Sequence, residues 1–455
     1  MLPAELRGLR VAILGTGREG RAAWRYLRQS CPELRLTLID EQPPAAEFLE
    51  RLTEWDQVRA GPLSAAGLED FDVLVRSPGI SPYRDCLRHA IDAGVLVTSP
   101  SNLWFAGHAD QRTICVTGTK GKSTTAALLA HLLAAGGARV RLAGNIGKPL
   151  LDCNDRGVDW WVIEMSSYQL ADLQARPNVA VLLNLTPEHL DWHGRERTYR
   201  RDKLRLAELA RGRPVVANAA DPVLREALAG TPSVTWFNHS GGLRASGGRL
   251  LDGPRELDIR RPSGLPGDHN LSNIAAALTV VRLVGGKLEP AVGAIENFEP
   301  LPHRLQLCGI RSGVRCVNDS ISSTPVATAA ALDSFAGQRV TLIVGGLDRG
   351  VDWKPYIKTF ERHTPLAIIG IPASGAGILG TLDDCGIRPA EGLHEAPDLA
   401  AAVELGLRIS PEGAVLLLSP GAPSFPQFRD YRDRGRQFAR FCGFETEEVE
   451  SFLET

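Results

Sequence analysis

Residues 113–125 read TICVTGTKGKSTT, and this stretch decides the fold that the sequence predicts. Apolar β-branched residues at 114–116 favour a strand, a glycine-rich segment follows at 118–124, and an alanine- and leucine-rich run at 126–135 favours a helix. A strand, a glycine-rich loop and a helix in this order are the context in which Gly-Lys-Ser binds phosphate. Backbone N–H groups of such a loop point toward phosphate oxygens, and the helix N-terminus adds partial positive charge.

The side chains of this loop indicate a nucleotide phosphate bound with a divalent cation. Lys122 would reach the terminal phosphates, and Ser123 or Thr124 would hold Mg²⁺. The spacing is G-x-x-G-K-S, shorter than the usual loop, because Val116 stands where the first glycine would be. A surface turn with a chance Gly-Lys-Ser is the alternative, and the agreement of strand, loop and helix argues against it.

Composition narrows the class of protein. A length of 455 residues suggests about three domains, and 44% hydrophobic residues lets each bury a core. The net charge of −2 argues against a dedicated binder of nucleic acid or membranes. The 8 cysteines are scattered without a C-x-x-C pair, so we expect free thiols in a reducing cytoplasm. We find no signal peptide and no run of about 18 apolar residues.

The first segment carries a second nucleotide-binding pattern. A predicted strand at 9–14 runs into the G-x-G-x-x-G sequence at 15–20, and the next predicted strand ends in Asp40. This is the Rossmann fingerprint, which predicts a bound nucleotide but does not identify it as NAD. A later strand at 72–75 ends in a turn that contains Ser77, at the edge where α/β folds place ligands. An ordinary turn is an equally good interpretation of that last feature.

Polar residues also follow the strands of the central segment. The strand at 160–163 ends in Glu164, and a strand that begins at Val179 is followed by His189. Both ends belong to the edge where the phosphate loop lies, so Glu164 and His189 are candidates for binding a metal or the substrate. A single histidine at a strand end is more often structural, but the convergence of three strand ends favours a functional role.

Strands and helices alternate again after residue 301, which predicts another mostly parallel sheet. The glycine-rich stretch 240–267 predicts hairpins and loops, and the basic run 195–205, interleaved with acids, predicts a helix face. We therefore predict an α/β fold of three domains. They are a Rossmann-like domain at 1–99, a P-loop ATPase-like domain at 100–300 and a Rossmann-like α/β domain at 301–455.

Ten short motifs carry a resemblance that extends, in order, over nearly the whole chain. They are GTKGKST at 118–124, GNIG at 144–147, EMSSYQL at 164–170, NLTPEHLD at 184–191, YRRDKLR at 199–205, GDHNLSNIAAAL at 267–278, LPHR at 301–304, NDS at 318–320, GGLDRG at 345–350 and LLSPGAPSFPQF at 417–428. The sequence resembles the Mur ligases, and most closely the MurD-like ligases that add glutamate to UDP-N-acetylmuramoyl-L-alanine in peptidoglycan synthesis. Each motif alone is modest evidence, whereas their common order is strong evidence.

The resemblance implies ATP, two Mg²⁺ ions and four catalytic residues: Lys122, Glu164, His189 and Lys203. Ser123 and Glu164 should hold one Mg²⁺, and His189 should hold the second. Lys203 matches a lysine that family members carbamylate, which would give the second metal a carboxylate; the sequence alone favours an ordinary solvated lysine. The implied ATP-binding residues are Gly118, Thr119, Lys120, Gly121, Lys122, Ser123, Thr124, Asn270, Asn273, Arg304 and Asp319.

The resemblance also implies two further binding sites. The first domain should bind the uridine diphosphate group of the UDP-muramoyl-alanine substrate and not NAD. Asn145 and His189 should lie near the muramoyl-alanine end of that substrate. The residues implied for the UDP substrate are Gly15, Thr16, Gly17, Arg18, Asp40, Ser77 and Asn145. The residues implied for glutamate are Ser322, Ser323, Thr324, Arg349, Ser419, Pro423 and Phe428.

The implied reaction converts a carboxylate into an acyl phosphate, which the amine of glutamate then attacks. Lys122 and Mg²⁺ would screen the repulsion between the carboxylate and the γ-phosphate. Water must be excluded from the acyl phosphate, which predicts closure of the third domain over the second. The resemblance further implies a cytoplasmic monomer with small-molecule substrates that serves cell-wall synthesis, cell shape and cell division.

Two departures from the MurD pattern fall in loops that line the family's glutamate pocket. Ile321 replaces a lysine of the NDSKATN motif, and Pro423 removes an N–H donor and fixes φ. Because the other motifs are intact, we favour L-glutamate as the amino acid, with D-glutamate as the alternative. A folylpolyglutamate synthase lacks the first domain, a nicotinamide dehydrogenase lacks the phosphate loop, and a non-catalytic binding protein would lose the metal-binding groups; all three fit less well.

Overall fold

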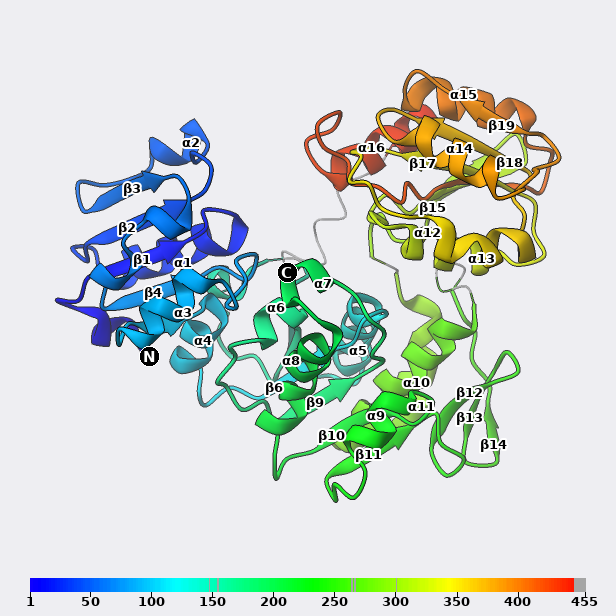
Figure 1. Cartoon of the computed structure of the whole chain (residues 1–455). Helices are drawn as coiled ribbons and strands as arrows, with labels where there is room; N and C mark the ends of the chain where they lie inside the picture. The colour runs from blue at the N-terminus through cyan, green and yellow to red at the C-terminus, as the bar shows by residue number, and fades with distance from the viewer. Residues whose placement is uncertain (147, 154, 263–264, 266, 300, 446–455) are drawn as a thin grey trace. The chain divides into compact units, whose positions relative to one another are not determined.

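The computed structural model describes residues 1–445 except 147, 154, 263, 264, 266 and 300, and Figure 1 shows its helices and strands. The chain divides into two compact units. Unit 1 consists of Met1–Ile259 with Leu271–Ala294, and unit 2 consists of Arg260–Asn270 with Ile295–Thr455. The domain boundaries predicted after residues 99 and 300 stay a prediction.

A five-stranded parallel sheet in the order β3-β2-β1-β4-β5 forms the N-terminal part of unit 1. The apolar strands β1 and β4 are buried throughout, as expected for central strands of a parallel sheet. Their carboxyl ends, with that of β2, bring the glycine-rich loop, Asp40 and Ser77 to one edge. The elements are β1 Val11–Leu14, α1 Arg18–Ser30, β2 Leu36–Asp40, α2 Ala46–Leu49, β3 Asp56–Ala60, β4 Val73–Arg76, α3 Asp85–Asp92, β5 Leu96–Thr98 and α4 Pro100–Gly107.

A six-stranded parallel sheet in the order β11-β10-β9-β6-β8-β7 follows. Strand β6 is buried at every position because β8 and β9 flank it, and it delivers the phosphate loop to the middle of the carboxyl edge. The elements are β6 Thr113–Thr117, α5 Lys122–Ala135, β7 Val140–Gly144, β8 Trp160–Glu164, α6 Ser167–Leu170, β9 Val179–Leu182, α7 Leu190–His193, α8 Glu196–Leu209, β10 Val215–Asn218, α9 Pro222–Ala227 and β11 Val234–Phe237. Further along the chain lie β12 Leu243–Ser246, β13 Arg249–Asp252, β14 Arg255–Leu257, α10 Asp268–Leu283 and α11 Leu288–Ala294.

Unit 2 contains a six-stranded sheet in the order β15-β16-β20-β17-β18-β19. Only β15 runs antiparallel among these described strands, so the mostly parallel sheet predicted from the sequence is confirmed. The carboxyl ends of β16, β17 and β20 carry the motifs NDS, GGLDRG and SPGAP to one edge. The elements are β15 Gln306–Arg311, β16 Val314–Asn318, α12 Pro325–Asp333, β17 Val340–Gly345, α13 Ile357–Arg362, β18 Ala367–Ile371, α14 Gly375–Asp384, β19 Leu393–Glu395, α15 Leu399–Ile409, β20 Val415–Leu418 and α16 Tyr431–Phe441.

The structure refines three of the sequence predictions. Helix α5 begins at Lys122, before the expected residue 126, because Gly121 ends the loop in the left-handed region at φ 82°. The glycine-rich stretch forms the antiparallel strands β12–β14. The basic run 195–205 lies on helix α8, as predicted, but Lys203 is only 2% exposed. The interpretation of Lys203 as a solvated lysine is therefore wrong.

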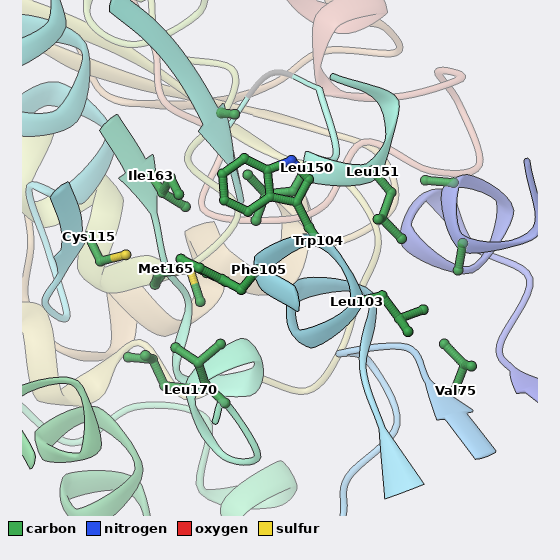
Figure 2. Close-up of a cluster of buried hydrophobic side chains, with 14 of the residues drawn as sticks. Val75, Leu103, Trp104, Phe105, Cys115, Leu150, Leu151, Ile163, Met165 and Leu170 are labelled. Carbon is green, nitrogen blue, oxygen red and sulfur yellow. The ribbon is translucent and has the colours of Figure 1, made fainter. Parts of the chain in front are cut away.

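Helix α4 joins the two sheets of unit 1 through one hydrophobic core. Trp104 and Phe105 pack among apolar residues of the central sheet, whereas Leu103 lies toward Val75 of strand β4 (Figure 2). The same buried cluster includes residues of helix α1 and of the segment at Leu150. Burying apolar surface from both sheets together stabilises them as one body.

We predict that Gly20→Ala destabilises the protein strongly. A Cβ atom at Gly20, in helix α1, would lie 1.8 Å from the carbonyl oxygen of Gly15, so helix and loop could not keep their close contact. We expect a loss of at least about 3 kcal/mol in the free energy of unfolding. Urea denaturation measures it.

Gly17→Ala is the matched control, because a Cβ atom at Gly17 would meet nothing within 4 Å. We expect it to change the free energy of unfolding by no more than about 1 kcal/mol. Equal stability of the two variants would contradict the close packing of Gly20 against the loop.

Candidate functional site

Asn184 holds the phosphate loop between β6 and α5 through three hydrogen bonds. Its side chain accepts from the backbone N–H of Lys120 at 2.8 Å and donates to the Lys120 carbonyl at 3.0 Å, while its carbonyl accepts from Thr119 at 2.8 Å. Asn273 packs on the other side, since a Cβ atom on Gly121 would lie 2.5 Å from its Oδ1. The loop is therefore fixed in shape by the fold before any ligand binds.

Thr119 contributes to this support through its side chain. Its Oγ1 donates to the carbonyl of Thr186 at 3.0 Å and lies 2.6 Å from the hydroxyl of Tyr199, and the residue is buried. The hydroxyl of Thr119 is thus bonded within the protein, and the predicted contact of this residue with ATP stays a prediction. The sequence analysis missed Tyr199, which lies one helical turn before Lys203.

Lys203 reaches the phosphate loop from helix α8. Its Nζ donates to the carbonyl of Gly118 at 2.7 Å. Burial, reinforced by the nearby charge of Lys122, holds the pKa of Lys203 well below its usual range, although Glu188 and Glu164 act in the opposite direction. A buried amine with a depressed pKa is more often neutral and is therefore nucleophilic.

Glu164 ends strand β8 as a buried carboxylate. Its Oε1 accepts from Nδ2 of Asn145 at 2.7 Å, whereas its Oε2 has no hydrogen-bond partner among the described residues. A cation is the natural partner of a carboxylate oxygen in such a place. Asn145 thus orients Glu164, and its predicted place near the substrate stays a prediction. Gly147 of the same motif lies outside the described residues.

Glu188 and His189 follow strand β9. Glu188 accepts from Nζ of Lys120 at 2.7 Å, and its Oε2 lies 3.8 Å from Nε2 of His189. Burial would raise the pKa of Glu188, but Lys120 outweighs it and the pKa lies below its usual range. The sequence analysis missed Glu188, although it directly precedes a predicted site residue at the same strand end.

The first sheet places the predicted UDP-binding residues together at its carboxyl edge. Asp40 accepts from the backbone N–H of Thr16 at 2.5 Å and from its hydroxyl at 2.8 Å. Burial alone would raise the pKa of Asp40, but these bonds from Thr16 hold it below its usual range. Ser77 donates to the carbonyl of Gly15 at 3.0 Å. Gly17 and Arg18 continue this loop into helix α1.

Two polar contacts tie the end of β4 and the loop after it to the central part of unit 1. Arg76 is fully buried, and its Nε donates to Asp172 at 2.8 Å. Tyr83 donates to Asp202, which also lies 2.8 Å from Nδ1 of His193. The sequence analysis missed this network, although an arginine that directly follows an apolar strand was a usable signal.

In unit 2, Asp319 at the end of β16 is a buried hydrogen-bond acceptor. It accepts from the hydroxyls of Ser322 at 2.5 Å and Ser419 at 2.7 Å and from the backbone of Leu305 at 3.2 Å. Burial raises the pKa of Asp319 to about 6, although these bonds and Arg304 favour the ionised form. Three residues predicted to bind ATP or glutamate are thus bonded to one another.

Arg434 of helix α16 connects the loops that follow three strands. It is 0% exposed, and its guanidinium donates to the carbonyls of Ser320 at 2.9 Å, Ala422 at 3.0 Å and Gly345 at 3.3 Å. Burial lowers the pKa of Arg434 to about 9, although Asp319 acts in the opposite direction. The sequence analysis missed this residue because it lies outside every strand end.

The remaining predicted residues of unit 2 divide into two groups. Ser323, Arg349 and Pro423 line one pocket. Thr324 precedes helix α12, and Phe428 packs in the hydrophobic core. Their roles toward glutamate stay predictions, as do the roles of Asn270 and Arg304 toward ATP.

The sequence is similar to that of known proteins over nearly its whole length. Residues 9–99 match the MurD-like N-terminal domain of Mur ligases, and residues 116–281 match the Mur ligase middle domain. The chain is 44% identical over 453 residues to the UDP-N-acetylmuramoyl-L-alanine--L-glutamate ligase of Xanthomonas campestris pv. campestris strain 8004, covering 97% of each protein. The chain belongs to the Mur ligase family.

A second relative and a solved structure agree with this assignment. The ligase of the same name from Xylella fastidiosa strain 9a5c is 44% identical over 458 residues, covering 98% of this Mur ligase and 97% of its own length. The crystal structure of MurF ligase from Thermotoga maritima in complex with ADP shares the α/β multi-domain fold, with a TM-score of 0.62 and 17% identity over 95% of this chain and 94% of that one. The predicted fold class is confirmed, and the chain is an ATP-dependent ligase that forms amide bonds.

The side chains predicted to bind metal do not form a cluster of acidic, histidine or cysteine side chains. Among the described residues, no three His, Cys, Asp or Glu side chains come together in a way that could hold a metal. The predicted ligands also include the hydroxyl of Ser123 and a modified Lys203, which such a cluster would not contain. In the part of the chain that the structure describes, no helix is long and apolar enough to cross a membrane.

We predict that Asp319 makes the stability of this Mur ligase depend on pH. Its pKa of about 6 in the folded protein exceeds the value near 4 of an unfolded chain. Its contribution is therefore fully present below pH 4 and is lost as the pH rises through 6, by about 3 kcal/mol at most.

Asp319→Asn removes this titration and leaves the other groups in place. The difference in urea-unfolding free energy between wild type and variant, measured from pH 4 to pH 7, should change in favour of the variant as the pH rises. Parallel pH profiles of the two proteins would show that Asp319 does not titrate in this window.

Proposed function

We propose that this Mur ligase joins L-glutamate to UDP-N-acetylmuramoyl-L-alanine, with ATP converted to ADP and phosphate through an acyl phosphate. The observation that carries the proposal is the group of buried residues around the phosphate loop, where Lys203 and the unpaired oxygen of Glu164 lie beside a loop of fixed shape. Two relatives of nearly equal length, named as ligases of this reaction, support it.

Residues at the carboxyl edge of the six-stranded sheet of unit 1 would activate the substrate carboxylate. Lys122 and the backbone of the loop at 118–124 would hold the β- and γ-phosphates of ATP. Ser123 and Glu164 would hold one Mg²⁺, and His189 with Lys203 would hold a second. Mg²⁺ bound there would neutralise the charge that builds up when one anion attacks another. The orphaned oxygen of Glu164 supports this assignment, because a buried carboxylate oxygen needs a cation or a donor.

No three His, Cys, Asp or Glu side chains come together among the described residues, and carbamylation of Lys203 would add a carboxylate for the second metal ion. Its burial and depressed pKa favour the neutral amine, which is the form that attacks CO₂. The amine loses a proton as the N–C bond forms, and the product is an anion beside Lys122. The charge that now lowers the pKa of Lys203 would then stabilise the carbamate.

The first sheet would bind the UDP group of the substrate. Its glycine-rich loop places the backbone of Gly17 and Arg18 at the N-terminus of helix α1, at the carboxyl edge, while the N–H groups of Gly15 and Thr16 donate to Ile39 and Asp40 and hold the loop. Diphosphate oxygens suit that position, and Asp40 and Ser77 fix the loop around it. Asn145 would lie near the muramoyl-alanine end of the substrate and would orient Glu164 through the hydrogen bond between them.

We assign L-glutamate because the sequence departs from the MurD pattern where the amino acid would bind. Pro423 lines the pocket in unit 2, where its ring fixes φ and removes an N–H donor from a loop whose carbonyl at this position accepts from the backbone of Leu347 at 2.8 Å. Ile321 presents an apolar side chain where the pattern has a lysine. D-glutamate is the alternative substrate. Monomeric state and cytoplasmic location stay predictions from the resemblance.

We predict that purified protein releases phosphate from ATP only with Mg²⁺, UDP-N-acetylmuramoyl-L-alanine and L-glutamate present. D-glutamate should give less than about one tenth of the rate, because a pocket that places both carboxylates of one isomer misplaces the amine of the other. A phosphate-release assay with each isomer measures this. Turnover with D-glutamate alone would overturn the assignment of the isomer, and no turnover with either would overturn the reaction.

We predict a carbamate on Lys203. Protein equilibrated with ¹³C-bicarbonate should show a carbamate carbon resonance that is absent in Lys203→Met, and that variant should lose about 100-fold in turnover because a metal carboxylate is missing. Lys287→Met removes an exposed lysine and serves as the control. An unchanged resonance in Lys203→Met would assign the carbamate to another lysine and refute the prediction.

A further inference from the structure

A small pocket opens at the carboxyl edge of the sheet in unit 2. Its volume is about 190 Å³, which suits a small molecule better than a nucleotide. Loops after β16, β17 and β20 and the start of helix α14 line it, and its walls include Ser323, Arg349, Trp353, Ser374 and Pro423. Three of these residues were predicted to bind glutamate, but Ser374 was not.

Ser374 stands directly before helix α14 but does not cap it. Its side chain makes no hydrogen bond to the first turn of the helix, which is the usual role of serine at that position. The residue is 8% exposed, and its buried Oγ has no hydrogen-bond partner among the described residues. An unsatisfied buried hydroxyl costs about 1–3 kcal/mol. A ligand that accepts from this hydroxyl would recover that cost.

The surrounding backbone fixes the hydroxyl at the positive end of the helix. The N–H of Ser374 donates to the carbonyl of Gly346 at 2.9 Å. Gly375 packs closely against Gly370, since a Cβ atom there would lie 2.6 Å from the Gly370 carbonyl carbon. The ten residues of α14 direct their first N–H groups and their dipole toward this end. Hydroxyl and helix terminus together suit a carboxylate.

Arg349 supplies a second group that attracts anions. It is exposed on the loop after β17 and lines the same pocket. The neighbouring acid, Asp348, also lines the pocket, and its carboxylate accepts from the backbone N–H of Gly350 at 2.8 Å within its own loop. The pocket thus offers two separate places for negative charge, which matches a molecule with a carboxylate at each end.

We propose that Ser374 and the N-terminus of α14 bind one carboxylate of the incoming amino acid while Arg349 binds the other. The Ser374 hydroxyl donates to the carboxylate oxygen, and the pocket thereby selects a dicarboxylic amino acid over its amide. The inference rests on the proposed function, because it names a specificity residue for the same reaction.

The test compares Ser374→Ala with Ser410→Ala. Ser410 is also 8% exposed and lies in unit 2, but its hydroxyl is 2.7 Å from that of Thr341 and lines no part of this pocket. We expect Ser374→Ala to raise the KM for glutamate about 10-fold, as for a lost hydrogen bond to a charged group, with the KM for ATP unchanged. Ser410→Ala should keep both KM values.

Several outcomes would overturn the proposal. One is an unchanged glutamate KM in Ser374→Ala, and another is an equal rise in the KM for ATP and glutamate. Ser374→Cys, nearly the same size but a weak donor, provides a second variant if the alanine variant does not fold, and it too should raise the glutamate KM. Failure of the wild-type protein to turn over either isomer of glutamate would instead reject the proposed function, so the two failures are distinguishable.

Discussion

The carbonyl oxygen of Gly118 accepts a hydrogen bond from the buried amine of Lys203, and this contact joins helix α8 to the phosphate loop. Helix α8 must approach the phosphate loop closely for the two groups to meet. Tyr199 on the same helix therefore also reaches the loop, through Thr119. Because burial disfavours the charged amine, the fold keeps a reactive group beside the place where phosphate is expected.

In unit 2 the buried cation beside the strand ends is an arginine. Arg434 is as deeply buried as any side chain, and backbone carbonyls after three strands satisfy its guanidinium. Asp319 contributes opposite charge nearby. Each removed hydrogen bond would leave a buried carbonyl unpaired, so the loops that carry the predicted glutamate residues depend on one another. In both units, polar groups at carboxyl edges are held by the fold.

The sequence predicted those edges well because parallel strands impose a simple rule. Apolar runs that end in glycine or polar residues marked β1, β6 and β8, and the rule placed Glu164 at the correct strand end. Side-chain partners could not be predicted in the same way. The bonds that Ser322 and Ser419 donate to Asp319 were not predicted, and the roles of both serines toward glutamate stay predictions. Arg434 and Ser374 gave no signal because tertiary packing decides what an isolated arginine or serine contacts.

Helix α4 and the buried arginine at the end of β4 have a consequence for substrate choice. The shared core and the bond from Arg76 to Asp172 hold the two carboxyl edges of unit 1 in one body. A substrate anchored by its nucleotide at the first edge would then present its free carboxylate at a set reach. Unit 1 would therefore select substrates by length. In a precursor with one residue too many or too few, the reacting carboxylate would lie beyond the phosphate loop or would not reach it.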